Sequence, residues 1–402
     1  MKRLKILLVH NFYGSEAPSG ENAVYLAELA LLRSRGHEVL EFTRHSDEIR
    51  NHGWVGTLKG AASVPWNPFS LNNIRRLIAV EKPDIMHVHN SFPLLSPAIF
   101  YAARGTQTAT VLTLHNYRLF CPAAIPMRAG AVCTECLDQR NVWPALKHGC
   151  YRQSRLATVP LALNVALHRR LGTWGQQVDA FVALSEFQRQ RMAQAGLPLG
   201  RMMVKPNFYP GSPVVQPWAQ RQPYVVFAGR LTAEKGLISL LRAWQAWGEQ
   251  VPELRILGDG DLRQQLEQMA LDLPIRFMGQ LGGAEAEQQI AGAQLLVLPS
   301  ECFEGFPMVV REAFAFGTPA AVSNLGPLPS IVQAGVSGVV FEPGNPVSLL
   351  QVVKTAWQTH GLLERLGQGA RAEFEEKYTE EANYATLMGI YQRAMEVSHD
   401  AD

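Results

Sequence analysis

The sequence has no apolar run long enough to cross a membrane as a helix. The apolar stretch near the N-terminus ends at Val9, far short of the ~18 to 20 residues that a span requires. No small-residue cleavage site follows it, so we expect a buried first strand there and not a signal peptide. Low-complexity tracts are also missing. The composition, with 47% hydrophobic and 18% charged residues, is typical of a soluble globular protein.

Two further absences bear on function. No G-x-G-x-x-G motif follows the first predicted strand, which argues against a nicotinamide dehydrogenase. The cysteine-rich window at 121–150 contains few Lys or Arg residues and no aromatic side chains interleaved for base stacking. A zinc-containing nucleic-acid-binding protein is therefore only a remote alternative, and we expect no nucleic-acid partner.

The length and the charge pattern both predict two domains. A chain of 402 residues exceeds the usual length of one domain. Residues 1–205 carry 24 Lys and Arg against 13 Asp and Glu, whereas residues 206–402 carry 13 against 22. A basic half suits anionic lipid, a phosphate-bearing acceptor or nucleic acid, and attraction between the two halves is the alternative explanation.

Strand-like segments alternate with helical segments along the chain. Continuous apolar runs that end in polar residues suit parallel strands buried on both faces. We expect such strands at residues 5–12, 37–44, 84–90, 109–116, 223–231, 253–260, 275–281, 294–300, 318–323 and 338–343. The alternation predicts an α/β fold with parallel sheets. A segment with four prolines and no clear period, residues 206–222, predicts the linker between the domains.

The segment GRLTAEKG (229–236) follows a predicted strand and leads into a helix. Arg230 and Lys235 lie about one turn apart near the helix N-terminus, with glycines that let a backbone come close. Cations together with free backbone N–H groups favour a diphosphate site. A surface turn with a solvated arginine and lysine is the alternative interpretation.

The segment ECFEGFPMVVREAF (301–314) holds acids in an apolar stretch, where carboxylates are costly to bury without partners. With Pro307 at the start of a helix, Glu304 lies in the loop ahead of it and Glu312 lies inside it. Carboxylates accept paired hydrogen bonds from neighbouring hydroxyls, so these two suit a ribose and a second sugar. A Glu312 that faces solvent is the alternative, but its neighbours leave little polar face.

Together these motifs resemble the retaining family 4 glycosyltransferases, in a subgroup with a four-cysteine insertion in the N-terminal domain. The resemblance covers nearly all of residues 220–378. The matching residues are Gly229-Arg230, Lys235-Gly236, Gly258-Asp259-Gly260, the pair Glu304 and Glu312, and the continuation at 316–345. It implies the GT-B architecture, with two Rossmann-like domains whose parallel sheets face across a cleft. The expected parts are an acceptor-side domain (1–205), a nucleotide-sugar-binding domain (206–378) and a C-terminal helix (379–402) that crosses back to the first domain.

The resemblance also implies a role for each matching residue. Arg230 and Lys235 would hold the donor diphosphate, and Glu312 would bind the ribose hydroxyls. Glu304 would face the donor sugar. Contacts at the donor are further implied at Gly229, Gly258, Gly305, Phe306 and Pro307.

Two residues of the first half join this set through the resemblance. Gly20, in the loop APSGENAV (17–24), would approach the phosphates, although only one glycine of the usual pair is present. His115, at the end of the fourth strand, would lie against the donor sugar. A histidine that merely satisfies a strand end is the alternative for His115.

The implied reaction moves a hexosyl group, with retention, from a UDP- or GDP-sugar to a glycan or lipid-linked glycan acceptor. We expect it to serve the synthesis of a surface polysaccharide. Arg230 and Lys235 would neutralise the leaving diphosphate, so no catalytic metal is expected. A sugar-nucleotide epimerase or a phosphorylase of the GT-B architecture is the closest alternative.

Four of the five cysteines lie in one insertion, at about 117–155. The Cys-x-x-Cys pair with two further thiolates suits a tetrahedral zinc site built from Cys121, Cys133, Cys136 and Cys150. A cytoplasmic enzyme has no oxidising environment for disulfides. Structural zinc is therefore the prediction, with an iron–sulfur cluster, free thiols or disulfides as alternatives.

Residues 151–174 place arginines at both ends of an apolar segment. Such a segment suits an interfacial helix on an anionic membrane, and a core helix with solvated ends explains it equally well. We expect a cytoplasmic protein, with peripheral contact to the inner face of the cell membrane as a further hypothesis.

Overall fold

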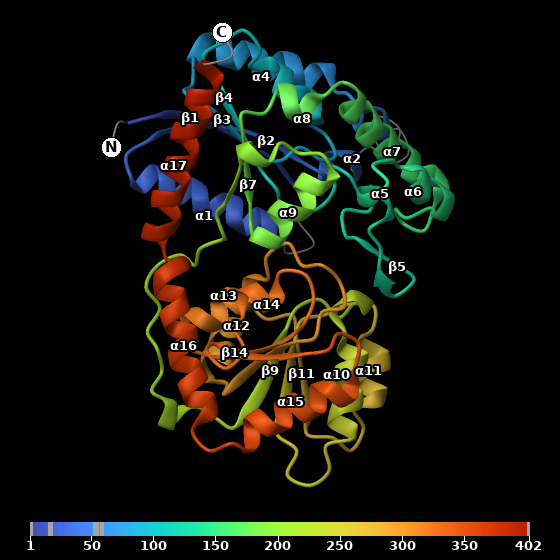
Figure 1. The fold of residues 1–402 in the computed structure, drawn as a ribbon, viewed down its shortest axis with the longest axis vertical. Helices are drawn as coiled ribbons and strands as arrows, with labels where there is room; N and C mark the ends of the chain where they lie inside the picture. Colours follow the sequence, from blue (N-terminus) through green and yellow to red (C-terminus); the bar gives the residue numbers. More distant parts are fainter. Residues whose placement is uncertain (1–2, 15–18, 51–55, 57–59, 400–402) are drawn as a thin grey trace. The chain divides into compact units, whose positions relative to one another are not determined.

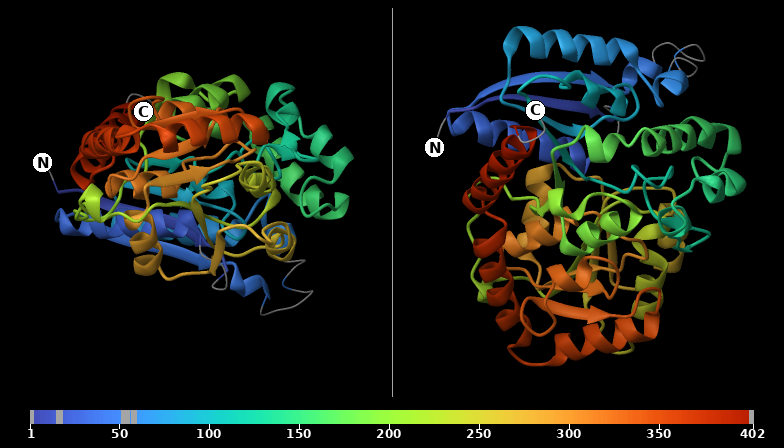
Figure 2. Two further views of the ribbon diagram at one scale, coloured as in Figure 1. Left: turned by 90° about the horizontal axis from the view of Figure 1, so that it is seen from below. Right: turned by 45° about the horizontal axis from the view of Figure 1, so that its top comes forward.

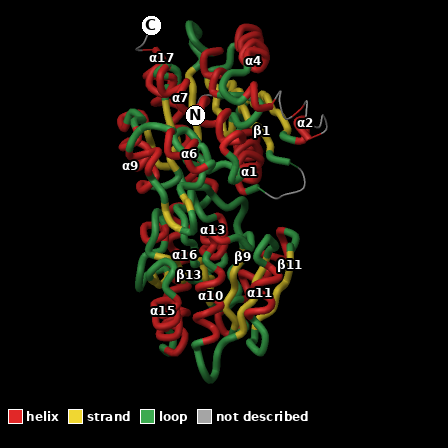
Figure 3. The backbone as a smooth tube through the Cα atoms, turned by 90° about the vertical axis from the view of Figure 1, so that its right-hand side faces the viewer, coloured by secondary structure: helices red, strands yellow, loops and turns green. Residues whose placement is uncertain are grey.

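The computed structural model describes residues 3–14, 19–50, 56 and 60–399. The chain forms two compact units (Figure 1). Unit 1 comprises residues 1–126, 134–206 and 383–402, and unit 2 comprises residues 127–133 and 207–382. Each unit is an α/β layer structure in its own right, with strands between helices (Figure 3).

The sheet of unit 1 has six parallel strands in the order β2-β1-β3-β4-β7-β8. Their bounds are β1 Lys5–Phe12, β2 Glu38–His45, β3 Ile85–Asn90, β4 Ala109–Thr113, β7 Ala180–Ala183 and β8 Met202–Val204. Strands β3, β4 and β7 are buried along their whole length, as the continuous apolar runs predict. In β3 that length includes two histidines, His87 and His89, whose polar rings are therefore buried.

The sheet of unit 2 also has six parallel strands, in the order β11-β10-β9-β12-β13-β14. Their bounds are β9 Tyr224–Ala228, β10 Glu253–Leu257, β11 Ile275–Gly279, β12 Leu295–Leu298, β13 Ala320–Ser323 and β14 Gly338–Phe341. The strand order reverses direction between β9 and β12. In such sheets, ligands bind beyond the carboxyl ends of the strands at this reversal.

Helices join the strands in both units. Those of unit 1 are α1 Gly20–Ser34, α2 Asp47–Arg50, α4 Pro68–Glu81, α5 Glu135–Asp138, α6 Trp143–His148, α7 Arg155–Arg170, α8 Thr173–Gln176 and α9 Glu186–Ala195. The short helices α5 and α6 lie in the predicted insertion, where α6 packs against α7, and α5 packs against α6 and α9 (Figures 1 and 2). The start of α4 has residues that favour a helix N-terminus. The Asn67 side chain accepts hydrogen bonds from backbone N–H groups of the first turn, and Pro68 occupies the first helical position.

Unit 2 contains α10 Leu237–Gln245, α11 Arg263–Met269, α12 Gly283–Gly292, α13 Met308–Ala315, α14 Leu328–Ile331, α15 Pro346–Gln358 and α16 Leu362–Lys377. A small hairpin, β5 Met127–Arg128 with β6 Ala131–Val132, is also assigned to it. Short 3₁₀ turns complete the two units at Pro97–Ala102, Leu199–Arg201, Trp218–Gln220 and Ala233–Lys235.

The last helix, α17 (Glu380–His399), begins in unit 2 and continues into unit 1. Its residues Leu387 and Tyr391 are fully buried in the core of unit 1, against β1 and α1. The segment is therefore a structural part of unit 1 although it lies almost 180 residues after β8 in the chain. Among the residues that the structure describes, no helix is long and apolar enough to span a membrane.

Candidate active site

Three loops meet at the carboxyl ends of neighbouring strands in unit 2. The backbone N–H of Gly229 donates to Leu257 O (3.0 Å), and that of Leu231 donates to Asp259 O (2.9 Å). These bonds hold the loop after β9 beside the loop after β10. On the other side, the N–H of Glu301 donates to Glu234 O (2.9 Å), which holds the loop after β12 beside the loop after β9. The three motifs at 229–236, 258–260 and 301–314 therefore lie next to one another in unit 2.

Two glycines permit this close approach. A Cβ atom at Gly236 would overlap the carbonyl oxygen of Pro299, and one at Gly258 would overlap the carbonyl oxygen of Gly229. Both residues also have positive φ angles, 70° and 123°, which L side chains rarely adopt. The glycines of this region therefore have a packing role that any side chain would break.

An ion pair joins the loop after β9 to the loop after β12. Lys235 Nζ lies 2.7 Å from Glu304 Oε1, and the Ser300 hydroxyl donates to the same oxygen at 2.5 Å. Burial opposes both charges, but their mutual attraction keeps the pKa of Glu304 below its ordinary value and the pKa of Lys235 above it. The site therefore holds a charged lysine and a charged glutamate in contact.

Arg230 is the exposed member of this group. Its side chain is 63% exposed and contacts Glu234 at 3.3 Å, one turn further along the loop. An exposed pair of this kind contributes little to stability. The Arg230 guanidinium can therefore turn toward an anion at small cost.

Glu312 lies inside α13, as predicted. Arg311 Nη2 contacts Glu312 Oε1 at 3.2 Å, while the buried Arg311 also donates to the carbonyl oxygen of Phe208. Burial raises the pKa of Glu312, Arg311 opposes the rise and Glu287 adds to it. The two acids of the segment thus have different surroundings: Glu304 has a lysine partner and a depressed pKa, and Glu312 has a raised one.

The residues between these acids connect the loop to the helix. Pro307 is the N-cap of α13, and Phe306 is buried with its ring edge against Tyr378, the centroids 5.6 Å apart. Gly305 is partly exposed. Glu301, for which the sequence analysis predicts no role, accepts a hydrogen bond from the Ser239 hydroxyl of α10 at 2.8 Å.

In unit 1, His115 follows β4 and lines a pocket together with Asn90, Asn116 and Arg118. Its Nε2 lies 3.2 Å from His89 Nδ1. Burial lowers the pKa of His115 well below its ordinary value, so the imidazole is neutral at pH 7.

The predicted phosphate loop lies partly outside the described residues, which exclude Ala17 and Pro18. Gly20 begins α1, and Glu21 follows it in the first turn. The Glu21 carboxylate accepts a hydrogen bond from Asn116 Nδ2 at 2.8 Å, so the start of α1 lies beside the segment that carries His115.

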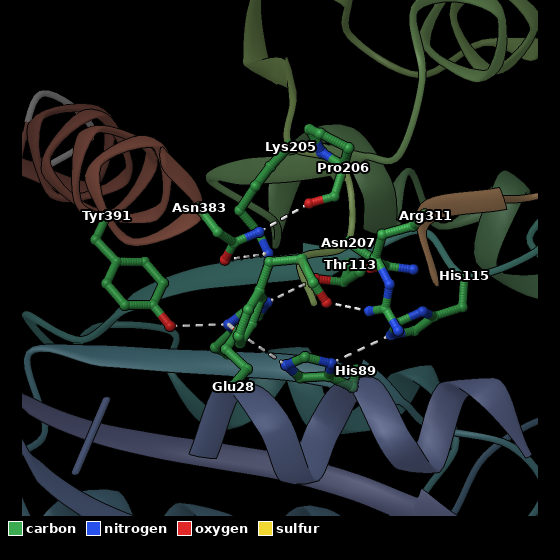
Figure 4. A network of polar contacts seen from close by, with 12 residues as sticks. Glu28, His89, Thr113, His115, Lys205, Pro206, Asn207, Arg311, Asn383 and Tyr391 are labelled. Carbon is green, nitrogen blue, oxygen red and sulfur yellow. Dashed lines mark hydrogen bonds and ion pairs between the residues drawn. The ribbon is translucent and has the colours of Figure 1, made fainter. Parts of the chain in front are cut away.

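A buried polar network behind His115 was missed by the sequence analysis (Figure 4). Glu28 contacts Lys205 Nζ at 2.8 Å, and His87 and His89 at 3.0 and 3.1 Å. The available signal was an acid on an otherwise apolar helix face, since Glu28 lies between Tyr25 and Leu32.

The four-cysteine zinc site is not confirmed. Within the described residues, the one group of three or more side chains with ligand atoms inside 4.8 Å of one another is Glu28, His87 and His89, and it contains no cysteine. The structure forms no disulfide among the five cysteines. Cys121 is buried, which raises the pKa of its thiol to about 12, and the nearby Cys136 and Cys150 raise it further.

Family models match both halves of the chain. The model described as Glycosyltransferase Family 4 matches residues 23–210, and the model described as glycosyl transferases group 1 matches residues 212–373. These matches indicate a family 4 glycosyltransferase of the GT-B fold.

The curated proteins to which this chain is similar include several named as glycosyltransferases. The chain is 26% identical to the sulfoquinovosyl transferase SQD2 of Arabidopsis thaliana over 86% of its length, and spans 65% of that protein. It is 33% identical to an uncharacterized glycosyltransferase of Methanocaldococcus jannaschii, of which it spans 45%. A phosphatidyl-myo-inositol mannosyltransferase of Mycolicibacterium smegmatis is 24% identical, with 94% of this chain and 92% of that protein covered.

Solved structures confirm the predicted fold class. A sucrose-phosphate synthase from Thermosynechococcus elongatus superimposes with a TM-score of 0.70 at 15% identity, covering 98% of this chain and all of the other. Anabaena Alr3699/HepE, solved in complex with UDP and glucose, superimposes with a TM-score of 0.66 at 17% identity, covering 97% of this chain and all of the other. At these identities the likeness establishes the fold alone.

Proposed function

We propose that this glycosyltransferase moves a hexosyl group, with retention of configuration, from a UDP- or GDP-sugar to a glycan or lipid-linked glycan acceptor. The observation that carries the proposal is the meeting of the loops after β9, β10 and β12 around the Lys235–Glu304 pair. The complexes of Anabaena Alr3699/HepE with UDP and with UDP-glucose support a nucleotide-sugar donor. Because these similar proteins are named as transferases, an epimerase or a phosphorylase is not favoured.

The proposed roles follow from the chemistry of each group. The exposed Arg230 and the charged Lys235 bind the diphosphate and neutralise the charge that develops as it leaves. Glu304, once Lys235 turns to the phosphate, accepts hydrogen bonds from hydroxyls of the sugar, and Glu312 accepts them from the ribose. The backbone around Gly229, Gly258 and Gly305 supplies N–H donors, and Gly20 does so for the phosphates.

The test is donor hydrolysis and transfer with the full-length protein. A panel of nucleotide sugars is incubated with the protein, with and without EDTA, and release of nucleoside diphosphate is measured. We expect release from one UDP- or GDP-sugar, unaffected by EDTA because Arg230 and Lys235 supply the positive charge. Failure with every donor, with or without a lipid-linked acceptor, would refute the function, and inversion at the sugar would refute retention.

We propose that α7 brings the enzyme to an anionic membrane, where a surface-polysaccharide acceptor on a lipid carrier is found. Three apolar side chains with helical spacing are exposed on α7: Leu156 by 85%, Val159 by 48% and Leu163 by 53%. Arg152 and Arg155 lie at one end of this exposed apolar face. Apolar side chains beside arginines are the arrangement of an interfacial helix.

Vesicle sedimentation tests this contact. The protein should sediment with vesicles that contain phosphatidylglycerol and stay in solution with phosphatidylcholine alone. The double variant Leu156→Ser/Leu163→Ser should lose the binding and keep donor hydrolysis. Equal sedimentation of the variant and the wild type would contradict the role of α7.

The zinc hypothesis for the four cysteines rests on their spacing and on the proximity of Cys121, Cys136 and Cys150. A zinc ion would deprotonate the coordinating thiols despite the raised pKa of Cys121. Metal analysis of the purified protein decides between the hypotheses. About one zinc per chain, lost in Cys133→Ser/Cys136→Ser, is the expected result, whereas iron would indicate a cluster and no metal would indicate thiols.

A further inference from the structure

The buried network behind His115 starts from an ion pair between two elements of unit 1. Glu28 on α1 and Lys205 after β8 both have side chains only 1% exposed, and Lys205 Nζ lies 2.8 Å from Glu28 Oε2. Burial alone would raise the pKa of Glu28, but the Lys205 ammonium is the largest opposing cause, and the pKa lies well below its ordinary value. Glu28 is therefore ionised, and its oxygens can only accept hydrogen bonds.

The ionised Glu28 determines which ring nitrogen of His89 carries a proton. Its Oε1 lies 3.1 Å from His89 Nε2, so Nε2 must donate. A second positive charge here would leave the buried network with a net charge, because Lys205 already balances Glu28. In the form of His89 that keeps this network neutral, the ring carries its single N–H on Nε2, and Nδ1 is an acceptor.

The same reasoning extends to His115. His89 Nδ1, as an acceptor, lies 3.2 Å from His115 Nε2, so His115 Nε2 must donate. Because the His115 ring is also neutral, its remaining nitrogen, Nδ1, carries a lone pair. Figure 4 shows the chain of contacts from Lys205 through Glu28 and His89 to His115.

We propose that Glu28 is a positioning residue for His115: acting through His89, it holds the His115 ring with its proton on Nε2 and its acceptor lone pair on Nδ1. Lys205 supports this arrangement by balancing the charge of Glu28 without giving a proton to either histidine. Glu28, His87 and His89 lie close to one another, but the charge of Glu28 is already balanced by the Lys205 ammonium, which contacts its other oxygen, Oε2.

The consequence for function concerns the hydroxyl that His115 can recognise. A lone pair on Nδ1 accepts a hydrogen bond from a sugar hydroxyl, whereas the other tautomer would present an N–H to it. The inference about the sugar rests on the role of His115 in the proposed function, but the tautomer itself does not. Groups that contact this network off the path to His115 include His10, Tyr25, His87, Asn383 and Tyr391.

The tautomer can be measured without any substrate. In protein with ¹⁵N-labelled histidine, protonated and unprotonated ring nitrogens have separate NMR signals, and the variant His115→Asn identifies those of His115. We expect the proton of His115 on Nε2 across neutral pH. A His115 proton on Nδ1 would overturn the proposal, whether or not any variant folds.

The variant Glu28→Gln should reverse the whole chain. Its amide oxygen must face the Lys205 ammonium, which leaves the NH₂ group to donate to His89 Nε2. His89 Nδ1 then donates, and His115 is forced to carry its proton on Nδ1. We expect this reversal in the spectrum and a fall in kcat of about 10–100-fold, the range known for partners that orient metal-ligating histidines, with unchanged affinity for nucleoside diphosphate.

Tyr391→Phe is the matched control. It removes a buried hydroxyl that contacts His87 Nδ1 at 2.8 Å, in the same network but off the path to His115. It should leave both the tautomer and kcat unchanged, even if it lowers the melting temperature as much as Glu28→Gln does. An unchanged His115 tautomer in Glu28→Gln, or an equal loss of kcat in Tyr391→Phe, would overturn the proposal. The expected tautomers in a protein that turns over no nucleotide sugar would instead refute the proposed function and leave the positioning role in place.

Discussion

At the scale of single residues, Glu304 and Glu312 have clearly different environments. Glu304 accepts hydrogen bonds from Lys235 and Ser300, and its pKa is lowered. Glu312 contacts Arg311, and its pKa is raised, chiefly by burial. Two carboxyl groups whose surroundings give them different pKa values can take different chemical roles.

We expect Glu304→Gln and Glu312→Gln to have different effects on the enzyme. Glu304→Gln should lower kcat by about 10²–10³-fold, a typical effect for one group that stabilises a transition state, and leave nucleotide affinity within a small factor. Glu312→Gln should strongly weaken nucleotide binding, because its amide replaces one of the two accepting oxygens assigned to the ribose hydroxyls with a donor. Calorimetry with nucleoside diphosphate and steady-state kinetics measure the two effects. The exposed Glu285→Gln is the control, and equal loss of binding in both variants would contradict this division of roles.

At the scale of elements, the site of unit 2 depends on how closely the loops after β9, β10 and β12 approach. Parallel strands lie close enough for their loops to meet, but side chains on the loops would hold them apart. Gly236 and Gly258 remove that obstacle. The alternation of strands and helices predicted which loops lie at this edge, and the glycines show why they touch.

Gly236→Ala should destabilise the protein more than Gly248→Ala. Both glycines have positive φ angles, 70° and 83°, so alanine is strained at either position. Only at Gly236 would the new Cβ overlap a backbone carbonyl, whereas open space surrounds Gly248. We expect about 1 kcal/mol of destabilisation at Gly248 and at least twice that at Gly236, where donor affinity should fall as well. Urea unfolding measures both, and equal losses would show that the close approach is unimportant.

At the scale of the whole molecule, burial of polar groups couples folding to pH. His10, His87 and His168 are fully buried, and burial is the largest cause that lowers their pKa values, to about 3 for His10 and about 4 for the other two. In the unfolded chain these groups take up a proton near 6.5. Unfolding below that pH therefore binds protons, and stability rises with pH in this range.

We expect the free energy of unfolding to be highest above pH 6.5 and to fall as the pH drops from 6.5 through 4. Each buried histidine contributes up to about 1.4 kcal/mol per pH unit in that window. Urea titrations at several pH values between these limits measure the slope. His168→Gln should reduce the slope and the exposed His360→Gln should not. A stability that does not change between pH 7 and pH 5 would contradict the neutral, buried state of these histidines.

The sequence predicted the α/β class and the parallel sheets because strands buried on both faces must be apolar along their length, a pattern that is visible in one dimension. It also placed His115 at a strand end, and Lys235 and Glu304 in loops that follow strands and precede helices, where ligands bind in such sheets. It did not predict Glu28, Lys205 or Tyr391 as one group. These residues come from α1, the end of β8 and α17, and nothing in their local sequence indicates that they share a core.

The sequence alone thus determined the elements of this protein and the residues available at their ends, because local periodicity and composition follow from burial. Only the tertiary structure decided which charges become partners. Lys235 meets Glu304, and Lys205 meets Glu28 across 177 residues of chain. A buried ion pair depends on the distance between two side chains in the folded state, and no spacing along the chain encodes that distance.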